Sequence, residues 1–133
     1  MKNNFYYFTL IFIASLIFLT GCDNPAPARV SGTVQFEGKP LAGASVTFMP
    51  VDESRSSEGV TNTNGKYELR FSASTKGAVV GEHRVEIRTA PKEVDRESKE
   101  KMIERLPEKY NNKTELKATL KSGTQTVDFD LQP

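Results

Sequence analysis

From residue 30 onward, apolar and polar side chains alternate along short stretches of the chain. In "VSGTVQF", Val30, Gly32, Val34 and Phe36 fall on one face, and the residues between them, two of them hydroxyl-bearing and one an amide, fall on the other. A period of two is typical of half-buried β-strands, because successive side chains point to opposite faces of a sheet. The alternation therefore predicts that this part of the chain folds as β-sheet.

The same pattern returns at intervals of about ten residues up to the end of the chain. Strands are predicted at 30–36, 44–50, 67–71, 81–89, 114–121 and 124–131, with a weaker one around 58–62. Glycine, proline and Asn-Gly turn signals separate several of them, such as "EGKPLAG" and "NTNGKY". We expect one all-β domain, a seven-stranded antiparallel β-sandwich.

The segment 91–113 breaks this period. It is rich in Lys and Glu, and Val94, Met102, Ile103 and Leu106 are its few apolar residues. Charged residues three or four apart support a short helix near 98–105, but so thin an apolar stripe makes a helix marginal. We expect a mobile excursion between strands, with a charged loop or short helix at about 92–106. A plain linker and a binding loop both remain open for it.

The N-terminus has a different composition. Residues 5–19, "FYYFTLIFIASLIFL", carry no charge, and Lys2 precedes them. A positive start, a short apolar centre and small residues at the exit are the parts of a secretory signal peptide. The run is shorter than the roughly 20 apolar residues that a membrane-spanning helix needs, so export is favoured over an uncleaved anchor.

The single cysteine, Cys22, stands where the apolar run ends, directly after Leu19, Thr20 and Gly21. A structural disulfide would need a second cysteine, which the sequence does not have. The tetrapeptide "LTGC" resembles the lipobox of bacterial lipoproteins. That resemblance implies a diacylglyceryl group on the Cys22 thiol and cleavage before it; two or more acyl chains give stable membrane attachment.

These features divide the chain into three parts: a signal peptide at 1–21, an acylated cysteine and proline-containing tether at 22–29, and a β-sandwich domain at 30–133. Cleavage removes Lys2 and leaves 17 basic and 17 acidic side chains. A balance of zero gives no indication of nucleic-acid binding. We expect a lipid-anchored monomer on the exported side of a bacterial cell membrane or envelope.

Residues suited to catalysis are few. The chain has one histidine, His83, and its one thiol is assigned to lipid. His83 is in register with Val85 and Ile87, which predicts a partly buried histidine at a strand end. A nucleophile with an adjacent base, or several convergent metal ligands, is not evident in the sequence. We therefore expect no enzyme activity, no metal and no cofactor beyond the lipid.

Candidate binding residues are equally sparse. Asp128 and Asp130 share a strand face, but their alternation with apolar residues favours a solvated surface over a calcium site. Five of the six aromatic residues after Cys22 fall on predicted inward faces, which leaves Tyr110 as the possible contact for a glycan or protein, although packing at the sandwich edge is the favoured role. An exposed charged row is predicted for Glu82, Arg84, Glu86 and Arg88.

Several stretches resemble the carboxypeptidase regulatory-like, or transthyretin-like, domains. They are "SGTVQFEGKPLAGASVTFMP", "TNTNGKYEL", "GEHRVEI", "PEKYNNKTEL" and "VDFDL", and the resemblance covers residues 29–133. More narrowly, the chain is similar to single-domain lipoproteins of planctomycete bacteria. The family's usual acidic residue in the second stretch is Asn62 here, and 92–105 looks like an insertion.

The resemblance implies a prealbumin-like (Ig-like) sandwich without established catalysis. Transthyretin-like hydroxyisourate hydrolases carry several histidines and a Tyr-Arg-Gly-Ser tail, whereas this chain ends in "DFDLQP". We therefore expect a non-catalytic envelope module for binding or structural support, with an unidentified envelope protein or glycan as partner. A transthyretin-like hydrolase and a secreted soluble binding domain are the alternatives.

Overall fold

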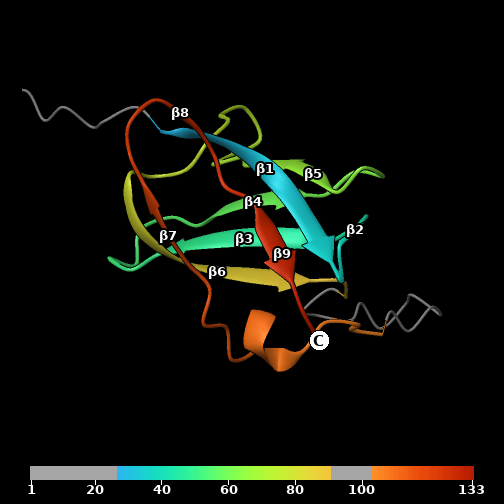
Figure 1. The fold of residues 1–133 in the computed structure, drawn as a ribbon. Helices are drawn as coiled ribbons and strands as arrows, with labels where there is room; N and C mark the ends of the chain where they lie inside the picture. The colour runs from blue at the N-terminus through green and yellow to red at the C-terminus, as the bar shows by residue number, and fades with distance from the viewer. Residues whose placement is uncertain (1–26, 91–102) are drawn as a thin grey trace, which may run out of the picture.

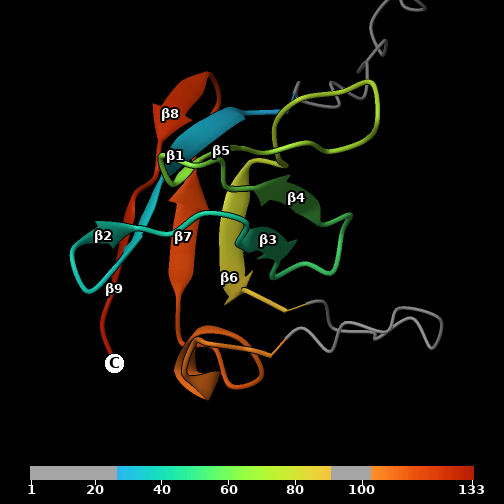
Figure 2. The same cartoon turned by 90° about the vertical axis from the view of Figure 1, so that its right-hand side faces the viewer.

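The computed structural model describes residues 27–90 and 103–133. The predicted all-β sandwich is confirmed: two β-sheets pack face to face (Figure 1). Turned by 90°, the molecule shows β1, β2, β8 and β9 in one layer and β3, β4 and β6 in the other (Figure 2).

The first sheet is organised around β1 (Arg29–Phe36). On one side, β1 pairs antiparallel with β5 (Lys66–Glu68) and with the two-residue β2 (Lys39–Pro40). It also pairs, in parallel, with β8 (Thr124–Thr126) and β9 (Phe129–Leu131). Every other strand of this sheet is thus hydrogen-bonded to β1.

The second sheet is fully antiparallel and has the order β4-β3-β6-β7. It consists of β3 (Ser45–Pro50), β4 (Ser57–Val60), β6 (Gly81–Arg88) and β7 (Lys117–Leu120). One turn of 3-10 helix, η1 (Glu108–Tyr110), precedes β7. The alternating burial along β3 and β6 is the period of two that the sequence displays.

The prediction of seven antiparallel strands differs from the structure at the C-terminus. The predicted strand 124–131 is interrupted at Val127 and Asp128, and its two halves run parallel to β1. At the break, the Val127 carbonyl accepts a hydrogen bond from the Tyr67 hydroxyl at 2.6 Å. The Asp128 carboxylate accepts one from the Thr33 backbone N–H at 2.7 Å, in place of a ladder partner. The Val127 N–H still donates to the Ser31 carbonyl at 2.9 Å, so the Asp128 side chain replaces a ladder acceptor only beyond that bond.

Aromatic rings fill the centre of the core. Phe48 is fully buried, and its ring centroid lies 6.5 Å from Tyr67, 6.2 Å from Phe129 and 5.8 Å from His83. These spacings are in the range of favourable aromatic contacts. Two other rings predicted to face inward, Phe36 and Phe71, are only half-buried.

The turn before β5 shows what Asn62 does. Its side-chain Oδ1 accepts hydrogen bonds from the backbone N–H groups of Asn64, at 2.9 Å, and Lys66, at 3.0 Å. Gly65 follows with a φ of 73°, which suits a residue without Cβ. The Asn62 side-chain oxygen thus closes this turn in the way that a carboxylate oxygen of an acidic residue could.

The domain begins slightly earlier than predicted. Ala28, assigned to the tether by its sequence, is fully buried and exchanges two 2.8 Å backbone hydrogen bonds with Ala78. Arg29 is the first residue of β1. These residues are therefore part of the sandwich, because pairing with a distant loop decides their conformation.

Most of the predicted loop or helix at 92–106 falls on residues 91–102, outside the described residues. Residues 103–107, which follow, are not helical, and the nearest helical turn is η1.

Gly32 gives a direct test of the contact between β1 and the residues that join β8 to β9. A Cβ at this position would overlap with the Val127 carbonyl oxygen and lie 2.9 Å from a Tyr67 ring carbon. We expect Gly32→Ala to lower the free energy of unfolding by about 3 kcal/mol or more, because the backbone itself must move. Chemical denaturation measures this loss.

Gly43→Ala is the matched control. Gly43 has a φ of 70° but nothing within 4 Å of an added Cβ. Gly43→Ala should lower the free energy of unfolding by only about 1–2 kcal/mol, the conformational penalty of a left-handed alanine. Equal losses for the two variants would contradict the close contact at Gly32.

Candidate functional site

The predicted lipidation site lies outside the described residues, since Leu19, Thr20, Gly21 and Cys22 all precede residue 27. Within residues 27–90 and 103–133, no helix has the length and apolar character to cross a membrane.

The two ends of the sandwich are formed by different segments of the chain. Ala28 bridges Ala78, Arg29 pairs with Thr124, and Gly81 pairs with Leu120 at one end. We call residues 27–30, 51–56, 70–81 and 120–124 the N-terminal pole; the loop 51–56 belongs to it because the Val51 N–H donates to the Glu82 carbonyl at 3.0 Å. The opposite end, here called the distal pole, comprises residues 37–44, 88–90 and 103–113. Figure 1 shows the start of β1 and the orange segment after residue 103 at these opposite ends.

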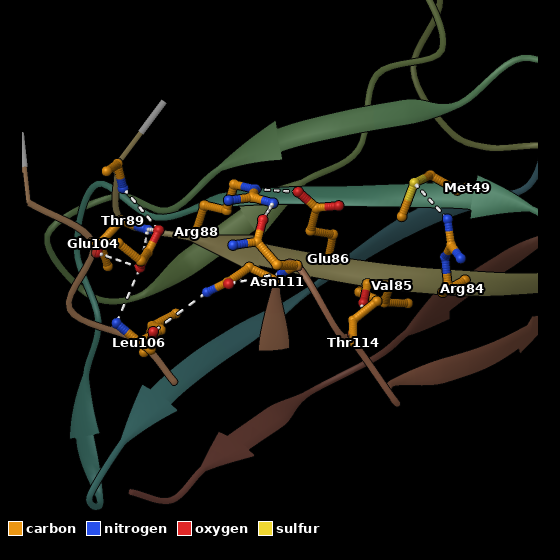
Figure 3. A network of polar contacts seen from close by, with 12 residues as sticks. Met49, Arg84, Val85, Glu86, Arg88, Thr89, Glu104, Leu106, Asn111 and Thr114 are labelled. Carbon is orange, nitrogen blue, oxygen red and sulfur yellow. Dashed lines mark hydrogen bonds and ion pairs between the residues drawn. The ribbon is translucent and has the colours of Figure 1, made fainter. Parts of the chain in front are cut away.

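At the distal pole, the Glu104 carboxylate joins the two chain segments that flank residues 91–102. It accepts hydrogen bonds from the Thr89 hydroxyl at 2.8 Å, the Thr89 N–H at 3.1 Å and the Ala90 N–H at 3.3 Å. The Leu106 N–H also donates to it at 3.0 Å (Figure 3). The Arg105 N–H donates to the Thr89 hydroxyl at 2.8 Å. We call this arrangement the Glu104 clasp.

The clasp favours the charged form of its carboxylate. Burial alone would raise the pKa of Glu104, but the hydrogen bonds from Leu106, Thr89 and Ala90 together outweigh it and lower the pKa. A carboxylate that accepts several backbone N–H bonds is stabilised as the anion. The clasp is therefore fully formed above the ordinary pKa of a glutamate and weakens as the pH falls below it.

Residues 106–114 anchor this pole to the sandwich. Leu106 is 5% exposed, and the buried Asn111 amide donates to the Leu106 and Pro107 carbonyl oxygens at 3.4 and 3.2 Å. The Thr114 hydroxyl donates to the Val85 carbonyl on β6 (Figure 3). The returning segment is thus fixed to the second sheet.

Tyr110 is a structural residue in this arrangement. Its side chain is 9% exposed, and its hydroxyl donates to the Gln132 carbonyl at 2.8 Å and accepts from the Gln132 N–H at 2.9 Å. The Lys109 ammonium lies 5.2 Å from the ring centroid. The ring therefore joins the C-terminal end to η1 and offers little free face to a glycan.

The predicted charged row on β6 divides into two parts. Glu82 and Arg84 are exposed, and Arg84 extends to the Met49 sulfur at 3.9 Å. Glu86 and Arg88 form an ion pair whose side chains are 14% and 13% exposed, and Arg88 donates to the Asn112 side-chain oxygen at 2.8 Å. Figure 3 shows the Glu86 and Arg88 side chains pointing toward one another.

His83 is more deeply buried than its predicted strand-end position implied, at 1% exposure. Its Nδ1 lies 3.1 Å from the Gly81 carbonyl oxygen, an acceptor, so Nδ1 carries the proton. The other ring nitrogen, Nε2, is buried without a hydrogen-bond partner among the described residues. Burial lowers the pKa of His83, although the Gly81 carbonyl and the charge of Asp52 oppose that shift.

The surroundings of His83 offer limited chemistry. A surface hollow of about 420 Å³ lies beside it, lined by apolar and charged side chains that include Met49, Val51, Glu82 and Lys117. Among the described residues, no group of three or more His, Cys, Asp or Glu side chains is placed to hold a metal ion.

The two C-terminal aspartates are exposed and separately engaged. Asp128 binds the Thr33 N–H, and the Asp130 carboxylate accepts a 3.3 Å hydrogen bond from the Gln132 amide. Each thus has a local structural partner.

Comparison with known proteins finds distant similarity among solved structures. No family model and no curated protein matches the chain. Among solved structures, it is similar to a DUF3823 family protein from Parabacteroides merdae, with 15% identity, a TM-score of 0.42, and coverage of 82% of this chain and 48% of that one. The chain therefore spans about half the length of that structure.

The Glu104 clasp was missed by the sequence analysis. Glu104 is one of many acidic residues in a charged stretch, and Thr89 ends a predicted strand fifteen residues earlier. The one available signal was a hydroxyl residue at the start of the excursion and an acid at its return, a pairing that many loops contain by chance.

His83 predicts how stability depends on pH. A folded-state pKa below the ordinary value means that the unfolded chain binds the proton more tightly. The free energy of unfolding should therefore be constant above about pH 6.5 and fall as the pH decreases through the folded-state pKa. His83→Asn, which retains a donor near Nδ1, should flatten this decline. Since His83 is the only histidine, an equal slope of unfolding free energy against pH in the wild type and in His83→Asn would contradict this prediction.

Loss of the Glu104 charge should weaken the clasp. In Glu104→Gln, an amide N–H₂ replaces one acceptor oxygen opposite the Thr89 N–H. We expect a loss of about 1 kcal/mol in unfolding free energy, modest because the site is partly solvated, and faster amide exchange at Thr89 and Leu106. The control is Glu108→Gln, which removes an exposed pair with Lys113. Unchanged exchange in Glu104→Gln would refute the clasp.

Proposed function

We propose that the chain is an exported bacterial lipoprotein, held to the cell envelope by a diacylglyceryl group on Cys22. Its β-sandwich, of the carboxypeptidase regulatory-like type, would act without catalysis as a module that binds an envelope protein or glycan, or gives structural support. The observation that carries this proposal is "LTGC" at the end of an uncharged run, with a folded domain beginning six residues after the cysteine.

The distance from the anchor to the domain supports this proposal. The six residues from Cys22 to Ala28 reach at most about 20 Å when fully extended. A lipid on Cys22 would therefore keep the N-terminal pole close to the bilayer. The distal pole would face away from it, since β6, with eight residues, spans about 26 Å between the two poles.

A partner would then meet the distal pole first. Residues 88–90 and 103–113, which flank the rest of the charged segment, lie there, and the Glu104 clasp together with the Asn111 hydrogen bonds holds them. A rigid scaffold that positions a surface loop is a common arrangement for binding. His83, by contrast, has one nitrogen bonded to a backbone carbonyl and its ring against Phe48, which favours a structural role over a catalytic one.

Intact mass spectrometry of the membrane fraction tests the anchor. Wild-type protein should start at residue 22 and carry a diacylglyceryl-sized addition, whereas Cys22→Ser should lack the addition. Ala26→Ser introduces the same residue four positions downstream and should be acylated like the wild type. Unmodified, soluble wild-type protein would favour the secreted-domain alternative.

A further inference from the structure

We infer that the hollow beside β4 is a binding site for a neutral oligosaccharide, with Phe71 as the ring on which a sugar unit stacks. The inference deepens the proposed function and rests on its binding role, to which it gives a class of ligand and a place on the domain. None of the residues that line the hollow belongs to the distal pole.

The hollow has a volume of about 850 Å³. It is lined by β4, by the loop before β4 and by the turn that follows β5. The lining side chains include Arg55, Ser56, Glu58, Val60, Arg70 and Phe71. A concave surface of this size is in the range of ligand-binding sites.

The Phe71 ring has no role in the core. Phe71 is half-buried, and among the aromatic residues that the structure describes it alone neither belongs to the core nor packs against it. Phe36, which is also half-buried, does pack against the core. The guanidinium of the exposed Arg55 lies 5.4 Å from the Phe71 ring centroid. A ring face covered by a solvated side chain stays accessible to a ligand, because such side chains rotate on the picosecond to nanosecond timescale.

Backbone hydrogen bonds hold this ring at a fixed place. Glu58 and Arg70 exchange two of them, at 3.0 and 2.8 Å, which join the turn after β5 to β4. Within the turn, the Phe71 N–H donates to the Thr75 carbonyl at 2.9 Å, and the Thr75 N–H donates to the Ser72 hydroxyl at 3.1 Å. The ring is therefore positioned before a ligand arrives, which lowers the entropic cost of binding.

The charges of the hollow favour a neutral ligand that carries many hydroxyl groups. Two guanidinium groups, of Arg55 and Arg70, are balanced by two carboxylates, of Glu58 and Glu68. A sugar hydroxyl both donates and accepts hydrogen bonds, so one sugar unit can bond to a carboxylate and to a guanidinium. A ligand of either charge would meet a like charge in the hollow. The apolar C–H face of the sugar ring can then stack on Phe71.

A peptide strand fits this place less well. Extended peptides bind by pairing with a free strand edge. The N–H and the carbonyl of Glu58 on β4 are already bonded to Arg70. The edge of β4 is therefore occupied where the hollow lies, whereas the side chains around it remain exposed.

The experiment uses the full-length, acylated protein in a zwitterionic detergent, because a maltoside detergent would offer a competing sugar. The probes are neutral hexasaccharides of α-linked glucose, β-linked glucose, mannose and N-acetylglucosamine, and hexagalacturonate as a charged counterpart. Calorimetry measures the affinity, and backbone amide chemical shifts locate the site. Each probe is titrated to about 10 mM, at which a complex with a millimolar Kd is mostly formed.

We expect at least one neutral hexasaccharide to bind and to shift the amides of Glu58, Phe71 and Ser72. Phe71→Ala should weaken its binding by about tenfold, as truncation of a central aromatic contact does, whereas Phe71→Tyr should retain it. Arg55→Ala should weaken binding by about threefold, through the loss of a donor on an exposed side chain. The matched control is Arg105→Ala, which removes an exposed arginine at the distal pole and should leave the affinity unchanged.

Three results would overturn the inference: no binding of any neutral hexasaccharide, amide shifts confined to other parts of the domain, or tighter binding of hexagalacturonate. Shifts of the same amides by a lysine-rich or glutamate-rich peptide, and by no oligosaccharide, would likewise overturn it in favour of a protein partner. The wild-type titration decides the matter even if Phe71→Ala fails to fold.

Failure of the anchor is seen separately. Protein without the acyl mass contradicts attachment through Cys22, while its oligosaccharide titration still tests the hollow. Acylated protein that binds no oligosaccharide contradicts the inference alone.

Discussion

The close approach of the Val127 carbonyl to Gly32 determines how the first sheet is assembled. Because Gly32 has no side chain, the Val127 carbonyl between β8 and β9 can lie close to the Gly32 backbone, and the Tyr67 hydroxyl donates to the same carbonyl. The Tyr67 ring centroid in turn lies 6.4 Å from that of Phe129 and 6.5 Å from that of Phe48 in the core. One backbone carbonyl therefore connects the C-terminal strands, the central strand and the aromatic cluster.

The fold class follows from the sequence because burial has a simple period. Val46, Phe48, Val85 and Ile87 are fully buried, as their alternation predicts. The direction and continuity of the last strand were not predictable in the same way. An alternating pattern is identical for parallel and antiparallel partners, and it continues through Val127 and Asp128 although the ladder breaks after the Val127 N–H has bonded to Ser31. Only contacts with Gly32, Tyr67 and Thr33, distant in sequence, decide that break.

The candidate site was less accessible from the sequence. The lipidation motif is local and readable, because it consists of adjacent residues. The Glu104 clasp depends on two segments meeting, and the sequence does not distinguish Glu104 from the other acidic residues of its charged stretch. For Tyr110 the sequence favoured packing at the sandwich edge and left a partner contact open, and the structure buries the residue against the C-terminal end. In the row on β6, sequence separates charged from apolar positions but does not reveal that Glu86 and Arg88 are largely covered.

The Glu104 clasp has a consequence for how this pole can change in evolution. By tying Thr89 and Ala90 to Glu104 and Leu106, it fixes the two points between which any intervening segment must close. Loop-closure entropy grows slowly, by about 0.6 kcal/mol for each doubling of length, so segments of very different size fit between the same two points at little cost. Residues inserted there leave the core contacts untouched. The sandwich can thus serve as a constant frame while the segment between these two points is exchanged independently of folding.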